Sequence, residues 1–145
     1  MKILCIYDGS GPKYHRCLLP SAGLEKYGYE IKVARYPKEE DLPGIDIILF
    51  NRALQGVNFE RVLTWKEKFG FKLVCDLDDA WELDKQHILY EGYKHHKVSA
   101  VIEWYIKHSD IITVTHERLA QQVRIINKLF NTTVKTKWKL LTSLK

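Results

Sequence analysis

Short apolar runs alternate with longer amphipathic segments along this chain, and that alternation restricts the fold more than any other feature. Short apolar or β-branched runs are typical of buried strands, and the longer segments have helical spacing. We predict strands at residues 2–7, 30–36, 45–50, 71–76 and 111–115, and helices at 14–27, 58–69, 98–109 and 117–129. Strands that alternate with helices indicate a parallel sheet covered on both faces. The sequence therefore predicts a single α/β, Rossmann-like domain with a mostly parallel sheet of about five or six strands and helices on both faces.

Residues 1–134 are expected to form this domain, and residues 135–145 a basic carboxyl-terminal tail. The chain has 145 residues and a net charge of +5. Every acidic residue lies at or before Glu117, and the carboxyl-terminal lysines Lys128, Lys135, Lys137, Lys139 and Lys145 follow with no acidic residue among them. A positive charge confined to one end argues against nucleic acid as a partner. Such a tail could contact an anionic membrane surface.

Cysteine usage indicates a reducing, cytoplasmic location. The chain has three cysteines, Cys5, Cys17 and Cys75, which show no metal-ligand spacing. Cys5 and Cys75 fall inside predicted strands and are expected to be buried. The apolar amino terminus reaches Asp8 too early for a signal peptide, so we interpret it as the first strand.

Three aspartates lie at and just past the carboxyl end of the predicted strand at residues 71–76. Asp76, Asp78 and Asp79 precede Trp81, and Tyr90 and Tyr93 come later in the long connection 77–94. Ligands of open α/β sheets bind at the carboxyl ends of strands, and carboxylates beside aromatic rings suit a polyol such as a sugar. Mg²⁺ is possible but not indicated, because nothing identifies the phosphate that it usually engages. The alternative is a solvated acidic turn.

A glycine-rich turn follows the first predicted strand. Gly9, Gly11 and Pro12 precede Arg16, whose guanidinium can hold a phosphate or carboxylate, or pair with the aspartates. Tyr14 stands where a dinucleotide fingerprint has its third glycine, which disfavours that cofactor. A plain strand-to-helix turn is the alternative. Pro20 predicts a kink in the helix that follows.

Further candidates follow other predicted strands. Asn51 and Arg52 follow the third strand, where an ordinary surface ion pair is the simpler interpretation. His87 lies in the long connection, and His116 follows the fifth strand. Most single histidines are structural, but these two occupy the expected ligand-binding edge.

Several of these segments together resemble a known family. The Gly11-Pro12-Lys13-Tyr14-His15-Arg16 segment, the Asp76-to-Trp81 segment and the strand-to-helix segment from Asp110 to Ala120 resemble the amino-terminal half of GT-B fold glycosyltransferases. The group is that related to glycosyltransferase family 4, including bacterial and phage examples, and the resemblance covers roughly residues 1–127. It implies transfer of a sugar from a nucleotide sugar, the donor substrate, to an acceptor held mainly by this half.

The resemblance also implies roles for residues. Gly9, Gly11 and Arg16 would border the donor phosphate, the three aspartates would face the acceptor or reacting sugar, and His116 and Glu117 would lie on the same wall. The catalytic candidates are Asp76, Asp78, Asp79 and His116. The substrate-binding candidates are Gly9, Gly11, Pro12, Arg16, Arg52, Trp81, His87 and Glu117. No metal ligand is expected.

The sequence departs from the family where a second, donor-binding half would begin. After Val134 it continues into the basic tail. We therefore expect the chain alone to be inactive and to meet a donor-binding half, or a second copy of itself, through an exposed cleft wall. A stand-alone carbohydrate- or partner-binding module is one alternative. The other is a haloacid-dehalogenase-like phosphatase with Asp76 as nucleophile and Asp78 as acid/base, although Ala80 and the downstream residues depart from that motif.

Overall fold

One parallel sheet organises the protein. A computed structural model describes residues 1–7, 11–127 and 133–136, the last of these as backbone only. The strands in these residues have the order β2-β1-β3-β4-β5-β6, and every neighbouring pair is parallel. They are β1 (Lys2–Ile6), β2 (Glu30–Ala34), β3 (Ile47–Asn51), β4 (Lys72–Leu77), β5 (Ile111–Val114) and β6 (Thr133–Thr136). The predicted single α/β, Rossmann-like domain is confirmed.

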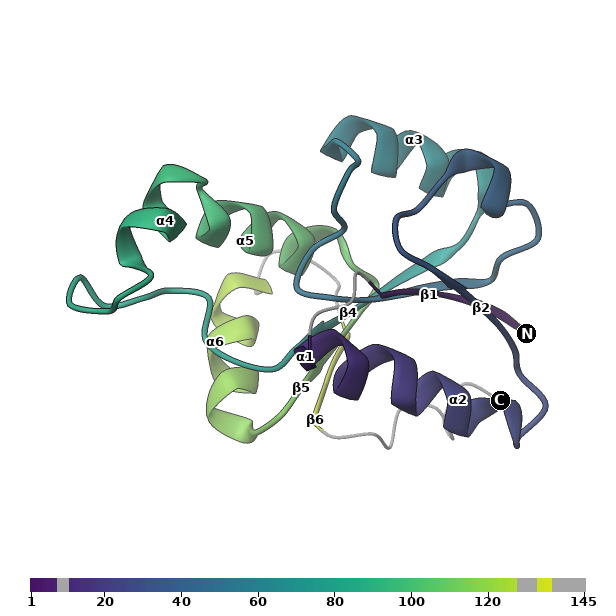
Figure 1. Cartoon of the computed structure of the whole chain (residues 1–145), viewed down its shortest axis with the longest axis horizontal. Helices are drawn as coiled ribbons and strands as arrows, with labels where there is room; N and C mark the ends of the chain where they lie inside the picture. The colour runs from purple at the N-terminus through teal and green to yellow at the C-terminus, as the bar shows by residue number, and fades with distance from the viewer. Residues whose placement is uncertain (8–10, 128–132, 137–145) are drawn as a thin grey trace.

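Helices cover both faces of the sheet, as Figure 1 shows. The segment between β1 and β2 lies on one face, and α3 and α5 lie on the other. The α-helices are α1 (Gly11–Lys13), α2 (Leu19–Glu25), α3 (Phe59–Phe69), α4 (Tyr90–His95), α5 (Val98–His108) and α6 (Glu117–Asn127). A π-helical turn, η1 (Tyr14–Leu18), joins α1 to α2, and a 3-10 turn, η2 (Glu39–Asp41), precedes β3. None of the helices in the described ranges is long and apolar enough to cross a bilayer.

The larger core lies between the sheet and the α3–α5 face. Side chains of a strand alternate between faces, so Leu73, Cys75 and Leu77 of β4 pack into this core while Val74 packs into the smaller one. The sequence fixes the ends of α3 locally. The Asn58 side chain accepts a hydrogen bond from the Arg61 N–H, as expected of an N-cap residue, and Gly70 ends the helix at a φ of 72°.

The helix expected at residues 14–27 is divided at the predicted interruption. The backbone N–H of Leu19 donates to the carbonyl of Tyr14, which is the wide spacing of a π-turn. Pro20 follows directly and has no N–H to continue the regular pattern. The wide turn contains Arg16 and the buried Cys17, and it therefore decides how Arg16 approaches the sheet.

The structure also differs from the sequence-based prediction in three places. β4 continues to Leu77, so Asp76 lies inside the strand rather than at its end. The connection 77–94 contains most of the short helix α4. β6 was not predicted, and it extends to Thr136, past the boundary at 134. Residues 137–145 of the expected tail lie outside the described residues. The three cysteines are buried, as predicted for Cys5 and Cys75, and none forms a disulfide.

Candidate functional site

The site begins with a row of polar side chains across three neighbouring strands. The register of the sheet places Asn51 of β3 opposite Asp76 of β4, and Asp76 opposite Thr113 of β5. All three residues are buried. The amide of Asn51 donates to the carbonyl oxygen of Asp76 at 2.8 Å, and the hydroxyl of Thr113 donates to Asp76 Oδ1. Parallel pairing therefore assembles a polar ladder at the carboxyl ends of the strands.

Arg16 reaches this ladder from the π-turn and forms a two-pronged ion pair with Asp76. Its Nε donates to Oδ2 and its Nη2 to Oδ1, each at 2.7 Å. The side chain of Asp76 is 0% exposed. Burial raises the pKa of Asp76, and the hydrogen bonds from Arg16 and Thr113 act in the opposite direction. Both carboxylate oxygens are thus occupied by protein donors, which is the geometry that stabilises a buried charge.

A second ion pair lies farther out along the same edge. Arg52 Nε donates to Asp78 Oδ1 at 2.8 Å, and Arg52 Nη1 donates to the hydroxyl of Tyr93 at 2.8 Å. The amide of Asn51 also donates to Asp78 Oδ1, at 3.3 Å. Burial acts to raise the pKa of Asp78, but the hydrogen bond and charge of Arg52 outweigh it, so the pKa is lowered. The carboxylate of Asp78 therefore stays ionised at neutral pH.

The backbone of Arg52 is unusual. Its φ is 61°, in the left-handed region that residues other than glycine rarely adopt. The backbone N–H of Arg52 donates to the Asp76 carbonyl at 3.0 Å, and the Arg52 carbonyl accepts from the thiol of Cys75. Strained conformations of this kind persist where the surrounding structure enforces them, and they concentrate at functional sites. From this backbone conformation the guanidinium contacts both Asp78 and Tyr93.

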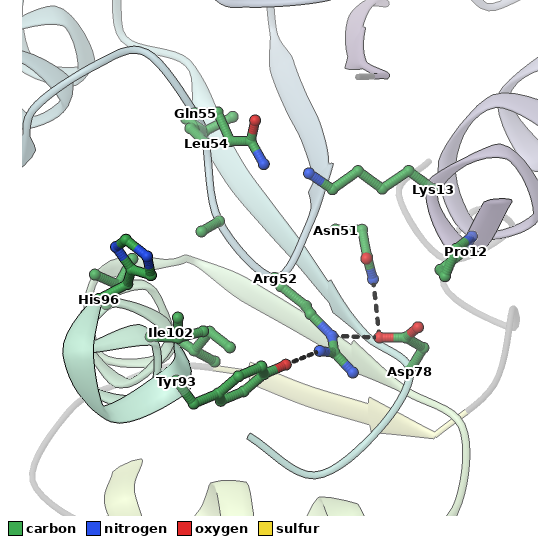
Figure 2. Close-up of a pocket in the computed structure, with 13 residues that line it drawn as sticks. Pro12, Lys13, Asn51, Arg52, Leu54, Gln55, Asp78, Tyr93, His96 and Ile102 are labelled. Atoms are coloured by element: carbon green, nitrogen blue, oxygen red, sulfur yellow. Dashed lines mark hydrogen bonds and ion pairs between the residues drawn. The ribbon is translucent and has the colours of Figure 1, made fainter. Parts of the chain in front are cut away.

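A cavity of about 510 Å³ opens beside this second ion pair. It lies at the edge where the connections after β1 and β3 diverge to opposite sides of the sheet, the usual ligand position in such folds. Figure 2 shows Asn51, Asp78, Arg52 and Tyr93 joined by hydrogen bonds at its base. The lining residues are Pro12, Lys13, Asn51, Arg52, Ala53, Leu54, Gln55, Asp78, Tyr93, His96, Val98, Val101 and Ile102.

Three of the predicted site residues, Pro12, Arg52 and Asp78, line this cavity. Arg16 and Asp76 lie beside it as the buried pair. Gly9 lies outside the described residues. Gly11 is exposed, and a Cβ added there would meet nothing within 4 Å, so its backbone does not require a glycine.

The other predicted site residues lie elsewhere. Asp79 is exposed, and its Oδ1 accepts from the N–H of Ala80 at 2.8 Å. His87 is exposed in its loop. The Nδ1 of His116 accepts from the N–H of Leu119 at 3.2 Å, which caps α6, and Glu117 pairs with Arg124. The hydroxyl of the preceding residue, Thr115, donates to the Asp78 carbonyl at 3.2 Å.

Trp81 is buried in the larger core. It lines a separate cavity of about 300 Å³ with residues of α6. Its indole N–H has no hydrogen-bond partner among the described residues. The aromatic residue after the acidic turn therefore occupies a core position in this chain.

The sequence analysis did not identify most of the cavity wall. Lys13, Gln55 and His96 supply polar groups, and Val98, Val101 and Ile102 of α5 supply an apolar surface. Tyr93 was noted only as one of several aromatic residues. The available signal was the Asn51-Arg52 pair after β3, which marks the same edge. Nothing local indicates that α5 turns three aliphatic residues toward it.

The described residues contain no group of three or more His, Cys, Asp or Glu side chains arranged to hold a metal ion. The chain matches no model of a known protein family, no characterised protein and no solved structure. Its function therefore has to be inferred from the site itself.

Proposed function

We propose that this domain forms the acceptor-side half of a glycosyltransferase, which moves a sugar from a nucleotide sugar to an acceptor hydroxyl. The observation that carries the proposal is the cavity at the carboxyl edge of the sheet, where Asp78, Arg52, Asn51 and Tyr93 meet. Its volume of about 510 Å³ suits a small ligand or one sugar unit. The resemblance of the Asp76-to-Trp81 segment to GT-B enzymes supports the same assignment.

In this proposal the acceptor lies against Asp78. The acceptor oxygen forms a bond to the anomeric carbon of the donor sugar, and the bond from that carbon to the nucleotide phosphate oxygen breaks. The nucleotide leaves with the bonding electrons, and the hydroxyl proton passes to a base. Both described side-chain contacts of Asp78 are made through Oδ1, and Oδ2 is our candidate to accept the acceptor hydroxyl.

The remaining candidates take different parts in the proposal. Asp76 acts as a positioning residue, because its buried carboxylate is occupied by Arg16 and Thr113. Asp79 and His116 are exposed at the same edge and remain candidates for proton transfer only if a partner domain covers them. Arg16 holds Asp76 in place and thereby fixes the end of β4.

The buried state of Asp76 argues against the phosphatase alternative. A carboxylate nucleophile must reach a phosphorus atom, but Asp76 is 0% exposed and both of its oxygens accept hydrogen bonds from protein. The binding-module alternative is favoured by one observation. The lowered pKa of Asp78 makes it a weak base at neutral pH, which suits hydrogen bonding to a ligand better than proton removal.

The test is turnover of nucleotide sugars by the purified chain, alone and mixed with a candidate donor-binding domain. The described residues form one Rossmann-like domain, and transfer needs both reactants held in productive geometry, which can contribute roughly 7–11 kcal/mol. We expect little transfer by the chain alone and clear transfer by the mixture, measured as nucleotide release together with glycosylated product.

Asp78→Asn is the informative variant, and Lys94→Gln is its matched control because Lys94 is an exposed residue outside this cavity. We expect Asp78→Asn to lower kcat/KM by at least about 10²-fold, and Lys94→Gln to leave it unchanged. If neither the chain alone nor its mixtures with donor-binding domains transfer sugar, but the chain still binds glycans, the binding module becomes the better assignment of function. Robust transfer by Asp78→Asn would remove Asp78 from the mechanism.

A further inference from the structure

The polar groups at the base of the cavity are largely engaged with one another. The amide of Asn51 and the Nε of Arg52 both donate to Asp78 Oδ1. Arg52 Nη1 uses one hydrogen on the Tyr93 hydroxyl, and Nη2 donates to no group within the described residues. Every side-chain hydrogen bond to Asp78 in that part of the chain uses Oδ1. The base therefore offers a ligand one carboxylate oxygen, Oδ2, and the remaining guanidinium hydrogens.

The charges that line the cavity give no reason to expect an ionic ligand. Arg52 and Asp78 form an ion pair at 2.8 Å and neutralise each other. Lys13 also lines the cavity, but it already interacts within the protein, so we assign it no unpaired charge. An anion at the base would also lie close to the carboxylate of Asp78, which repels it. The base thus suits a neutral polar group.

A single hydroxyl group matches the hydrogen-bonding groups that remain. Its hydrogen can be donated to Asp78 Oδ2, and its oxygen can accept from the guanidinium of Arg52. Asp78 and Tyr93 fix the orientation of this guanidinium, and the left-handed φ of 61° fixes its backbone. Such preorganisation lowers the entropy cost of binding. Two neighbouring side chains therefore satisfy a ligand that carries one hydroxyl.

The side of the cavity formed by α5 is apolar. Val101 and Ile102 follow Val98 at three and four residues, so the three side chains lie on one face of the helix, and we call them the apolar wall. All three line the cavity, and both valines are only partly buried, which leaves aliphatic surface open to a ligand. Figure 2 shows Ile102 on one side and Asp78 on the other, with Arg52 between them.

A saccharide fits this combination poorly. Its ring carries hydroxyl groups on most carbons, and those that lie against the apolar wall would lose hydrogen bonds to water without gaining protein partners. Gln55 and His96 add polar groups to the lining, but they are not part of this wall. An aromatic or alicyclic body instead removes its own apolar surface and that of the wall from water.

We propose that the acceptor for this cavity is a neutral hydroxyl compound with a compact aromatic or alicyclic body, and not a saccharide. The hydroxyl lies between Asp78 and Arg52, and the body lies on the apolar wall. The term acceptor rests on the proposed transferase function, whereas the binding chemistry does not. The proposal deepens that function because it names the class of compound that the cavity admits.

The experiment titrates the ¹⁵N-labelled chain by NMR with four probes that share one six-membered carbon ring: cyclohexanol, cyclohexyl methyl ether, cyclohexanecarboxylate and myo-inositol. We expect cyclohexanol to bind at least about tenfold more tightly than myo-inositol, because only cyclohexanol has an apolar body. Cyclohexanol should also bind severalfold more tightly than the ether, which has no hydroxyl hydrogen, and than the carboxylate, which is charged. The shifted amides should be those of the lining residues.

Variants assign the two parts of the site. Val101→Ser should weaken cyclohexanol severalfold and leave myo-inositol unchanged. Asp78→Asn should weaken cyclohexanol severalfold but not the ether, since an amide oxygen accepts less strongly than a carboxylate. Val33→Ser is the matched control, because Val33 is exposed on β2 and lies outside the cavity, and it should change neither affinity. Val98→Ser tests the wall if Val101→Ser fails to fold, as judged by circular dichroism.

Binding of myo-inositol as tight as that of cyclohexanol, or cyclohexanol binding that neither Val98→Ser nor Val101→Ser weakens, would overturn the inference. Tighter binding of cyclohexanecarboxylate than of cyclohexanol would overturn it in favour of an anion site. Transfer to a saccharide without binding of cyclohexanol would overturn it while leaving the proposed function intact. Binding of cyclohexanol without any sugar transfer in the mixture with a donor-binding domain would leave the binding chemistry intact and refute the transferase.

Discussion

Arg16 and Asp76 stand 60 positions apart in the chain, yet they form two hydrogen bonds of 2.7 Å, Nε to Oδ2 and Nη2 to Oδ1. The pair connects the π-turn before α2 to the end of β4. The neighbouring pair, Arg52 and Asp78, connects the residue after β3 to the residue after β4. Two parallel ion pairs therefore fix the base of the cavity, one buried and structural, the other partly exposed and open to a ligand.

The buried pair should contribute strongly to stability. Asp76→Asn leaves the Arg16 guanidinium facing a neutral group inside the protein, and we expect the free energy of unfolding to fall by about 3–5 kcal/mol. Urea denaturation followed by circular dichroism measures it. Glu30→Gln, which breaks the exposed Lys2–Glu30 pair, is the control, with a change of at most about 1 kcal/mol. A similar small loss for Asp76→Asn would show that the pair is not buried in solution.

The outer pair should make stability depend on pH. The pKa of Asp78 is lowered in the folded protein, so its contribution is complete above the unfolded pKa of about 3.9 and is lost as the pH falls through the folded value. The wild type should be more stable than Asp78→Asn at pH 7. This difference in the free energy of unfolding should shrink as the pH is lowered below about 4. Urea unfolding of both proteins across that range measures it. A difference independent of pH would exclude an ionised Asp78 in this pair.

Arg52 provides a test of backbone strain. Arg52→Gly and Arg52→Ala remove the same guanidinium, but only glycine adopts a φ of 61° without steric cost. We expect the glycine variant to be about 1 kcal/mol more stable than the alanine variant. Thermal and urea unfolding of the two variants measure the difference directly. Equal stabilities would indicate that the loop relaxes when Arg52 is replaced.

The structural and chemical roles of His116 can be tested separately. Its Nδ1 caps α6 by accepting from the Leu119 N–H, and asparagine is a strong N-cap residue. His116→Asn should retain the stability of the wild type, whereas His116→Ala should lose about 1 kcal/mol. If His116 also acts in transfer, as the resemblance implies, the asparagine variant would keep its stability and lose activity in the reconstituted assay. Equal losses of stability in both variants would refute the cap.

The sequence by itself determined the class of fold and the edge at which polar groups gather. Strand and helix periodicities are local, and parallel strands bring their carboxyl ends to one edge, so the positions of Asp78 and Arg52 at that edge followed from residue order alone. The buried cysteines in β1 and β4 followed from the same apolar runs. The predicted end of β4 was one residue too early. An aspartate inside a strand is stable only when distant residues supply its hydrogen bonds, and local sequence does not show them.

Those partners were decided by the tertiary structure. Alternation places Val74 and Asp76 on one face of β4, but only the packing of the π-turn brings Arg16 onto that face, and only the register brings Asn51 and Thr113 alongside. The apolar wall of the cavity comes from α5, about 50 residues after Arg52. Contacts between such distant segments depend on the free energy of the whole packed chain, and no local pattern of residues encodes them.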